Sequence, residues 1–144
     1  MSNNSCFFIT PIGAKDSPIR RKSEGLLNSV IDPLLKELSI TSTVSYKISE
    51  SGTITNQIIE HLLKDDLVIA NLTELNENVM YELAVRHACA KPLVILAENG
   101  TGLPFDIATQ RVLSYSNDME GVKELKKELK DAIEATLKKM YSSR

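Results

Sequence analysis

The chain alternates short, continuous hydrophobic runs with longer segments whose apolar residues recur at helical spacing. Three runs are apolar at successive positions and predict strands buried on both faces of a sheet: Ser5–Thr10, Asp66–Asn71 and Pro92–Ala97. In Thr41–Ile48, polar and β-branched residues alternate, which predicts a strand nearer an edge. Arg111–Tyr115 has a weaker pattern and is the candidate for a fifth strand.

Helical spacing predicts the elements between these strands. Ile19–Leu38 has apolar residues on one face, and Pro33 should kink or split that helix. Thr55–Lys64, Val79–Ala90 and Met119–Tyr141 are further amphipathic helices. For the third of these four helices, the pattern predicts a buried face formed by Met80, Leu83, Ala84 and His87.

The alternation of strands and helices indicates a parallel sheet covered by helices on both faces. We expect an α/β fold: a flavodoxin-like, doubly wound sheet of five parallel strands in the order 2-1-3-4-5, formed by residues 1–144 as a single domain. Right-handed crossovers bring every loop that follows a strand to one edge of the sheet. Ligands of such folds bind at that edge, between the first and third strands, so the candidate site residues lie in these loops.

Composition narrows the function classes. The 144 residues carry a net charge of −2 and the isoelectric point is about 5.7, which disfavours nucleic acid as a partner. No apolar run approaches the ~18 residues of a membrane span, and no secretion signal is visible, so we expect a cytoplasmic protein with no membrane partner. Cys6, Cys89 and the two histidines lack metal-ligand spacing, and no glycine-rich dinucleotide fingerprint is present. We therefore predict no metal and no bound cofactor.

Three loops at the ligand edge contain candidate binding residues. The first has a Pro-x-Gly turn, which brings backbone N–H groups near a ligand, and an arginine that can reach a phosphate. The alternative for the first and second loops is a plain turn with a helix cap. A phenylalanine before the last strand either stacks on a base or plugs the end of the sheet. These candidates are Pro11, Ile12, Gly13, Arg20, Ser51, Gly52 and Phe105.

The third strand leads into the most informative polar residues. Asn71 ends that strand, Asn76 is placed to cap the next helix, and Asn78 and Glu82 follow on one helix face. Glu82 lies beside the switch point, where a carboxylate can attack a sugar carbon or stabilise a cationic sugar. The alternative is an i,i+4 salt bridge between Glu82 and Arg86 on a solvated face.

A family resemblance rests on four segments: CFFITPIG, ISESGTITNQII, DLVIANLTELNENVMYELAVRHACAKPLVIL and LPFDIATQRVLSY. Together they resemble small bacterial domains related to nucleoside 2-deoxyribosyltransferases and to TIR-like domains. The resemblance covers roughly residues 5–116. Its most specific part, NxNVxYELAxRHAxxKP, runs from Asn76 to Pro92.

The resemblance implies a flavodoxin-like fold and cleavage of an N-glycosidic bond. In the transferases a glutamate at the YEL position attacks the anomeric carbon, and in TIR NADases a helix glutamate supports release of nicotinamide. Glu82 matches that position. By the same resemblance, Asn76 and Asn78 bind ribose hydroxyls or orient Glu82, and the protein forms a homo-oligomer.

One residue departs from the pattern. Related sequences usually read Ala-Asp-Leu-Thr after the third strand, and here Asn71 replaces the aspartate. Asparagine forms hydrogen bonds but carries no charge. If the aspartate is an acid or base in relatives, this protein turns over more slowly or binds without turnover.

Three functions follow from these observations. The first is a TIR-like N-glycosidase that hydrolyses a nucleotide, with NAD⁺ as the favoured substrate and antiviral defence as its setting. The second is a nucleoside 2-deoxyribosyltransferase or a deoxynucleotide N-hydrolase. The third is a nucleotide-binding or sensing module without catalysis. In each, the partner is a nucleotide or nucleoside.

Overall fold

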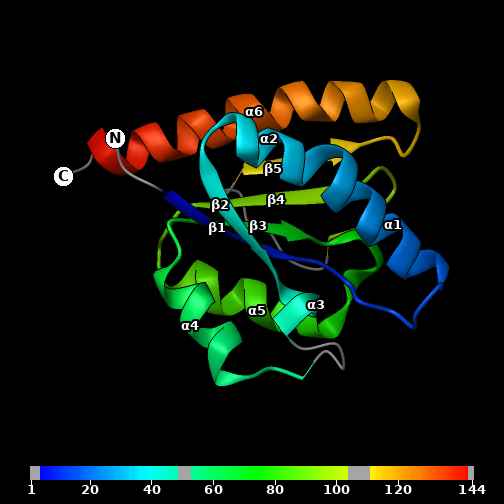
Figure 1. The fold of residues 1–144 in the computed structure, drawn as a ribbon, viewed down its shortest axis with the longest axis horizontal. Helices are drawn as coiled ribbons and strands as arrows, with labels where there is room; N and C mark the ends of the chain where they lie inside the picture. Colours follow the sequence, from blue (N-terminus) through cyan, green and yellow to red (C-terminus); the bar gives the residue numbers. More distant parts are fainter. Residues whose placement is uncertain (1–3, 49–52, 104–110, 143–144) are drawn as a thin grey trace.

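Five parallel strands form one sheet in the computed structural model, which describes residues 4–48, 53–103 and 111–142. The sheet order is β2-β1-β3-β4-β5 (Figure 1), which confirms the predicted α/β, flavodoxin-like architecture. The strands are β1 (Asn4–Ile9), β2 (Ile40–Val44), β3 (Leu67–Asn71), β4 (Leu93–Glu98) and β5 (Arg111–Tyr115).

Helices cover both faces of the sheet. On one face lie α1, α2 and α6, and on the other lie α3, α4 and α5 (Figure 1). Their bounds are α1 (Pro18–Leu26), α2 (Asp32–Glu37), α3 (Ser45–Ile48), α4 (Asn56–Lys64), α5 (Glu77–Ala88) and α6 (Met119–Ser142). None of the described helices combines the length and the apolar character needed to cross a membrane.

The side chains of β1 show why its run is hydrophobic at successive positions. Cys6 and Phe8 pack into the core beneath α1, α2 and α6, whereas Phe7 and Ile9 pack into the core beneath α4 and α5. All four are fully buried. Successive residues of a strand point to opposite faces, so a strand covered on both sides needs apolar residues throughout.

The helix predicted for Ile19–Leu38 is split, as the proline indicated. A π-helical turn, η1 (Leu27–Ile31), separates α1 from α2, and the N–H of Asp32 donates to the carbonyl of Leu27. Pro33 has no N–H, and its ring would clash with the carbonyl four residues earlier in a regular α-helix. The wider π turn shifts the backbone hydrogen bonds from four to five residues apart just before the proline. The sequence pattern did not predict this form of interruption.

The edge strand β2 is shorter than the strand predicted for Thr41–Ile48. Its register with β1 runs from Asn4 opposite Ile40 to Phe8 opposite Val44, and the chain then enters α3. The prediction of a strand through Ile48 was therefore wrong, although its edge position is confirmed. Continuing this register places Ile9, the last residue of β1, opposite Ser45, so the residues after Ser45 have no strand to pair with and satisfy their backbone groups in a helical turn.

Candidate active site

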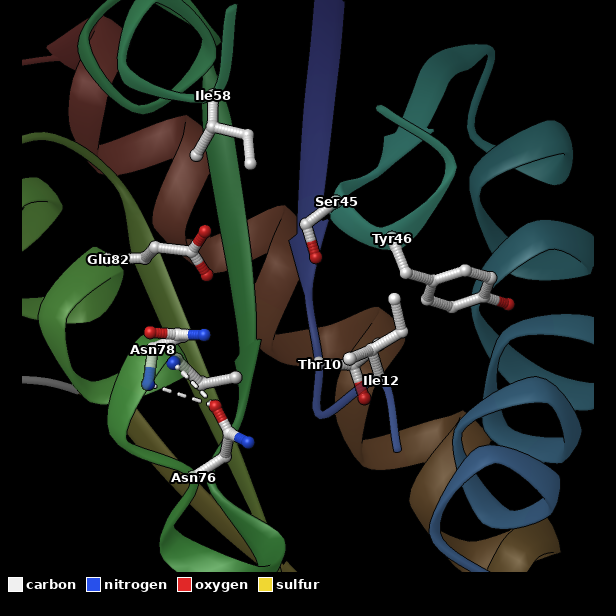
Figure 2. A pocket seen from close by; sticks show the side chains of 9 residues that line it. Thr10, Ile12, Ser45, Tyr46, Ile58, Asn76, Asn78 and Glu82 are labelled. Carbon is white, nitrogen blue, oxygen red and sulfur yellow. Dashed lines mark hydrogen bonds between the residues drawn. The ribbon is translucent and has the colours of Figure 1, made fainter. Parts of the chain in front are cut away.

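A pocket lies at the carboxyl ends of β1, β2 and β3, where the strand order reverses, as the fold predicts. Its walls come from segments far apart in the sequence: the ends of β1 and β2, α4, and the first turns of α5 (Figure 2). The space between its atoms is narrow, about 20 Å³, which is room for roughly one water molecule. The lining residues are Thr10, Ile12, Ser45, Tyr46, Ile58, Asn76, Asn78, Val79 and Glu82.

Glu82 supplies the carboxyl group among the residues that line this pocket. It lies in the second turn of α5, is only 4% exposed, and points its carboxyl group into the pocket (Figure 2). No hydrogen bond or ion pair joins it to another residue of the described ranges. Burial without a compensating positive charge raises the pKa of Glu82 from 4.5 to about 7. The group is therefore poised to change charge near neutral pH.

The buried face of α5 is not the one that the apolar pattern predicted. The buried residues are Val79, Glu82, Leu83 and Arg86. Leu83 is buried as predicted and Met80 is half-buried, but Ala84 and His87 are exposed, so the prediction was wrong for these two. The alternative of a solvated Glu82–Arg86 salt bridge is also wrong, because Arg86 is fully buried.

Arg86 supports the opposite end of the sheet from the pocket. Its Nη1 donates to the carbonyl of Leu62 at 3.0 Å, and its Nε and Nη2 donate to the carbonyl of Pro92 at 3.2 and 3.0 Å. These carbonyls belong to the end of α4 and to the residue before β4. A guanidinium can satisfy several acceptors at once, so it occupies a buried position that hydropathy alone assigns to an apolar residue.

Asn76 and Asn78 bring polar groups to the pocket beside Glu82. The Asn76 carbonyl oxygen caps α5, accepting from the N–H groups of Asn78 at 2.9 Å and Val79 at 3.1 Å (Figure 2). This cap confirms the role predicted for Asn76 and leaves its amide nitrogen to donate to a ligand. Asn78 lies one turn before Glu82 and lines the same pocket.

The Pro-x-Gly loop is held by side chains of α1. Three successive carbonyls accept hydrogen bonds: Pro11 from Ser23 Oγ at 2.7 Å, Ile12 from Arg20 Nε at 2.7 Å, and Gly13 from Arg20 Nη2 at 3.4 Å. Gly13 has a φ of 60°, and a Cβ there would lie 2.7 Å from Ser17 Oγ, so the turn requires glycine. Of the three loop residues, Ile12 lines the pocket.

Arg20 lies against a residue of the pocket wall. Its guanidinium lies 5.2 Å from the centre of the Tyr46 ring, and Tyr46 is a pocket wall. The sequence suggested a phosphate contact for Arg20; in the structure Arg20 bonds the loop carbonyls and is not among the residues that line this pocket.

Asn71 lies beneath the pocket in a buried chain of hydrogen bonds. Its amide nitrogen donates to Thr10 Oγ1 at 3.0 Å, and its carbonyl oxygen accepts from the N–H of Thr73 at 3.1 Å. Thr10 and Ser23 hydroxyls are 3.0 Å apart, and Ser23 also bonds the Pro11 carbonyl. That carbonyl can only accept, so the hydrogens point one way along the chain, from Asn71 through Thr10 and Ser23 to Pro11.

Replacing Asn71 with aspartate is expected to lower the free energy of unfolding at pH 7 by about 1–3 kcal/mol. An ionised aspartate only accepts, so Thr10 must turn its hydrogen toward it, and one of the two hydrogen bonds of Ser23 is then lost. Urea unfolding measures the effect, with Ser23→Ala as a second break in the same chain. An Asn71→Asp variant as stable as the wild type would contradict the direction assigned to the chain.

Several lining residues were missed by the sequence reasoning. Ser45 and Tyr46 lie at the ligand edge because β2 ends at Val44, and the predicted strand through Ile48 had placed them inside the sheet. Thr10 could have been recognised as a lining residue, because it is a polar residue directly after the buried strand β1. The predicted site residues Ser51, Gly52 and Phe105 lie outside the residues that the structure describes.

Comparisons with known proteins place the fold but no family. No protein-family model matches the chain, and no curated protein matches it. Among solved structures, the chain is similar to the Clostridium botulinum CMP N-glycosidase BcmB, with 13% identity, coverage of 86% of this chain and 97% of that one, and a TM-score of 0.56. A response regulator from Colwellia psychrerythraea matches with 12% identity, coverage of 90% and 98%, and a TM-score of 0.48. The likeness to BcmB shows a shared α/β fold.

Proposed function

We propose that the protein is an N-glycosidase that cleaves the base–ribose bond of a nucleotide, with NAD⁺ as the favoured substrate. The observation that carries this proposal is the carboxyl group of Glu82, buried in a pocket at the switch point of the sheet with no positive partner among the described residues. A carboxylate in such surroundings stabilises positive charge strongly, because little solvent screens it. The anomeric carbon of a departing sugar supplies that charge.

The reaction assigns Glu82 one task. The bond between the anomeric carbon and the base nitrogen breaks, and its electron pair stays with the base. The ionised Glu82 carboxylate stabilises the resulting oxocarbenium ion or bonds to it covalently. Water then adds to the anomeric carbon and loses a proton, which gives the free sugar. Asn76 and Asn78 line the pocket beside the carboxyl group and hydrogen-bond the sugar hydroxyls.

Asn71, which lies beneath the pocket and bonds Thr10 and Thr73, is compatible with NAD⁺ as the substrate. A neutral purine or pyrimidine leaves more easily when an acid protonates it, and asparagine cannot act as that acid. The nicotinamide of NAD⁺ already carries a positive charge and leaves as a neutral molecule without protonation. The absence of a carboxyl group at position 71 is therefore compatible with this substrate.

A second candidate is cleavage of a pyrimidine nucleotide or deoxynucleotide. It is favoured by the fold shared with BcmB, a CMP N-glycosidase. In that case the leaving base needs a proton, and Glu82, with a pKa of about 7, is the group in the pocket that can hold one. A transferase of this kind would also exchange one base for another.

Chromatographic analysis of the products separates these proposals. The protein is incubated with NAD⁺, CMP, and a panel of nucleosides and deoxynucleotides, with and without a second free base. We expect nicotinamide release from NAD⁺, reduced at least about 1000-fold in Glu82→Gln, which keeps the size of the side chain but not its charge.

The other outcomes are equally specific. Release of cytosine from CMP, or base exchange with deoxynucleosides, moves the assignment to the second candidate. If no glycosidic bond breaks while a nucleotide still raises the melting temperature, the protein is a binding module and catalysis by Glu82 is excluded. Equal activity of wild type and Glu82→Gln also contradicts the proposed mechanism.

A further inference from the structure

A second, larger cavity lies away from the pocket, between α1 with the η1 turn and the start of α6. These elements share one face of the sheet (Figure 1). The cavity measures about 670 Å³, and its floor is largely apolar, formed by Leu26, Val30, Tyr115 and Val122. Such a groove is far larger than the space beside Glu82, and no step of the proposed reaction uses it.

Gly25 keeps this groove open. It lies inside α1 and lines the cavity, and a Cβ added there would meet no atom within 4 Å. Glycine within a helix costs up to about 1 kcal/mol relative to alanine, so the fold itself would gain from a side chain. Gly25 therefore leaves open space above α1 at this point of the groove.

Met119 places an exposed apolar side chain at the edge of the same groove. It is 93% exposed, the most exposed of the large hydrophobic residues described. A methionine is flexible and apolar, which suits it to fill an irregular gap on a binding partner. Met119 opens α6 and so projects beside the groove rather than into the core.

Charges on the two rims have opposite signs. Arg21, on the α1 rim, forms no ion pair with the residues that the structure describes, and Asp118 lies on the α6 rim. In a two-fold dimer each copy presents the same patch to the other, so a contact from one rim to the opposite rim occurs twice. Under that symmetry Arg21 of one copy can face Asp118 of the other, and the same contact is repeated in reverse.

We propose that the groove is the docking surface for a second copy of this chain. In a two-fold arrangement, Met119 of each copy fills the space over Gly25 of the other, and Arg21 of each copy faces the acidic rim that contains Asp118. The opposite side of α1 holds the Pro11–Gly13 loop through Arg20 and Ser23, so the docked helix also supports a wall of the pocket. This inference does not depend on the proposed reaction.

Sedimentation analysis over a wide range of concentrations tests the surface. We expect a wild-type dimer, and we expect Met119→Asp and Gly25→Leu each to raise its dissociation constant about 100-fold or more, since each dimer loses two contacts. Gly25→Ala adds only a Cβ and should have a much smaller effect. Leu63→Gln, an exposed apolar residue on α4, is the matched control and should leave the dimer unchanged.

The rim charges give an independent check. Arg21→Glu should weaken the dimer about tenfold, and adding Asp118→Asn should recover part of that loss, because asparagine removes the repulsion. Asp118 also accepts from the N–H of Gly121 at 2.7 Å, a cap that asparagine preserves. A wild-type monomer at every concentration overturns the proposal, as does a dimer that survives both Met119→Asp and Gly25→Leu.

Discussion

Glu82→Gln is expected to stabilise the protein at pH 8 by up to about 3 kcal/mol while it removes glycosidase activity. Burial raises the pKa of Glu82 from 4.5 to about 7 in the folded protein. Between pH 4.5 and about pH 7, Glu82 keeps its proton in the folded state but has lost it in the unfolded state. The free energy of unfolding that Glu82 contributes therefore falls as pH rises through this range. Above about pH 7 the folded protein contains an unpaired buried carboxylate, which glutamine does not have.

The pH dependence of this effect distinguishes it from a general gain in packing. The advantage of Glu82→Gln in urea unfolding should shrink as pH falls and nearly vanish by about pH 4.5. Glu77→Gln is the matched control, because Glu77 is exposed in the first turn of the same helix. There glutamine should destabilise slightly, by about 0.3–1 kcal/mol, since a negative charge favours a helix N-terminus.

Activity should change with pH in the opposite direction to stability. If the ionised carboxylate acts on NAD⁺, kcat/KM rises through about pH 7 and levels off above it. A Glu82→Gln variant that is less stable than wild type at pH 8 would contradict the assignment of a charged, unpaired Glu82. The buried, ionised Glu82 carboxylate would then lower the free energy of unfolding while it serves catalysis, a trade-off that is common in active sites.

Arg86→Met is expected to cost about 3–5 kcal/mol of unfolding free energy, although methionine suits a buried position. Arg86 is fully buried, and three of its nitrogens donate to the carbonyls of Leu62 and Pro92. Methionine donates nothing, so both carbonyls stay buried without that partner, and the charge of Asp65 loses a positive neighbour. Thermal or urea unfolding measures the loss.

Arg86→Lys separates the charge from the geometry. Lysine keeps the positive charge, but its single ammonium cannot reproduce the fork that spans two carbonyls, so we expect a loss between those of wild type and methionine. If Arg86→Lys and Arg86→Met are equally destabilised, the fork explains the whole effect. If Arg86→Met is as stable as wild type, the backbone contacts contribute nothing measurable.

The fold was readable from the sequence because its strands are buried on both faces. Runs such as Phe7, Phe8 and Ile9 carry apolar residues for two cores at once, and that pattern is typical of parallel sheets. The position of Glu82 at the switch point followed from the order of the elements together with the spacing within its helix. The capping role of Asn76 followed from residue type alone.

The hydropathy pattern did not predict that Arg86 is buried, because its hydrogen-bond partners are backbone carbonyls of other segments. Arg86 and Glu82 are on the buried face of α5, whereas periodicity had predicted a face of Met80, Leu83, Ala84 and His87. The partners of Arg86 lie 24 and 6 residues away in the sequence, so no local window contains them both. The end of β2 was missed for a similar reason, since the length of β1 determines it.

The narrowness of the pocket sets a condition on every ligand that the protein binds. A space of about 20 Å³ is too small for a ribose, so the pocket must widen before a sugar reaches Glu82. If such an open form is about 1% of the free protein, a ligand binds about 100-fold more weakly than its contacts allow. Replacing Tyr46 with a smaller residue would then tighten ligand binding although it removes contacts. A weak measured affinity would reflect the low population of the open form rather than poor contacts in it.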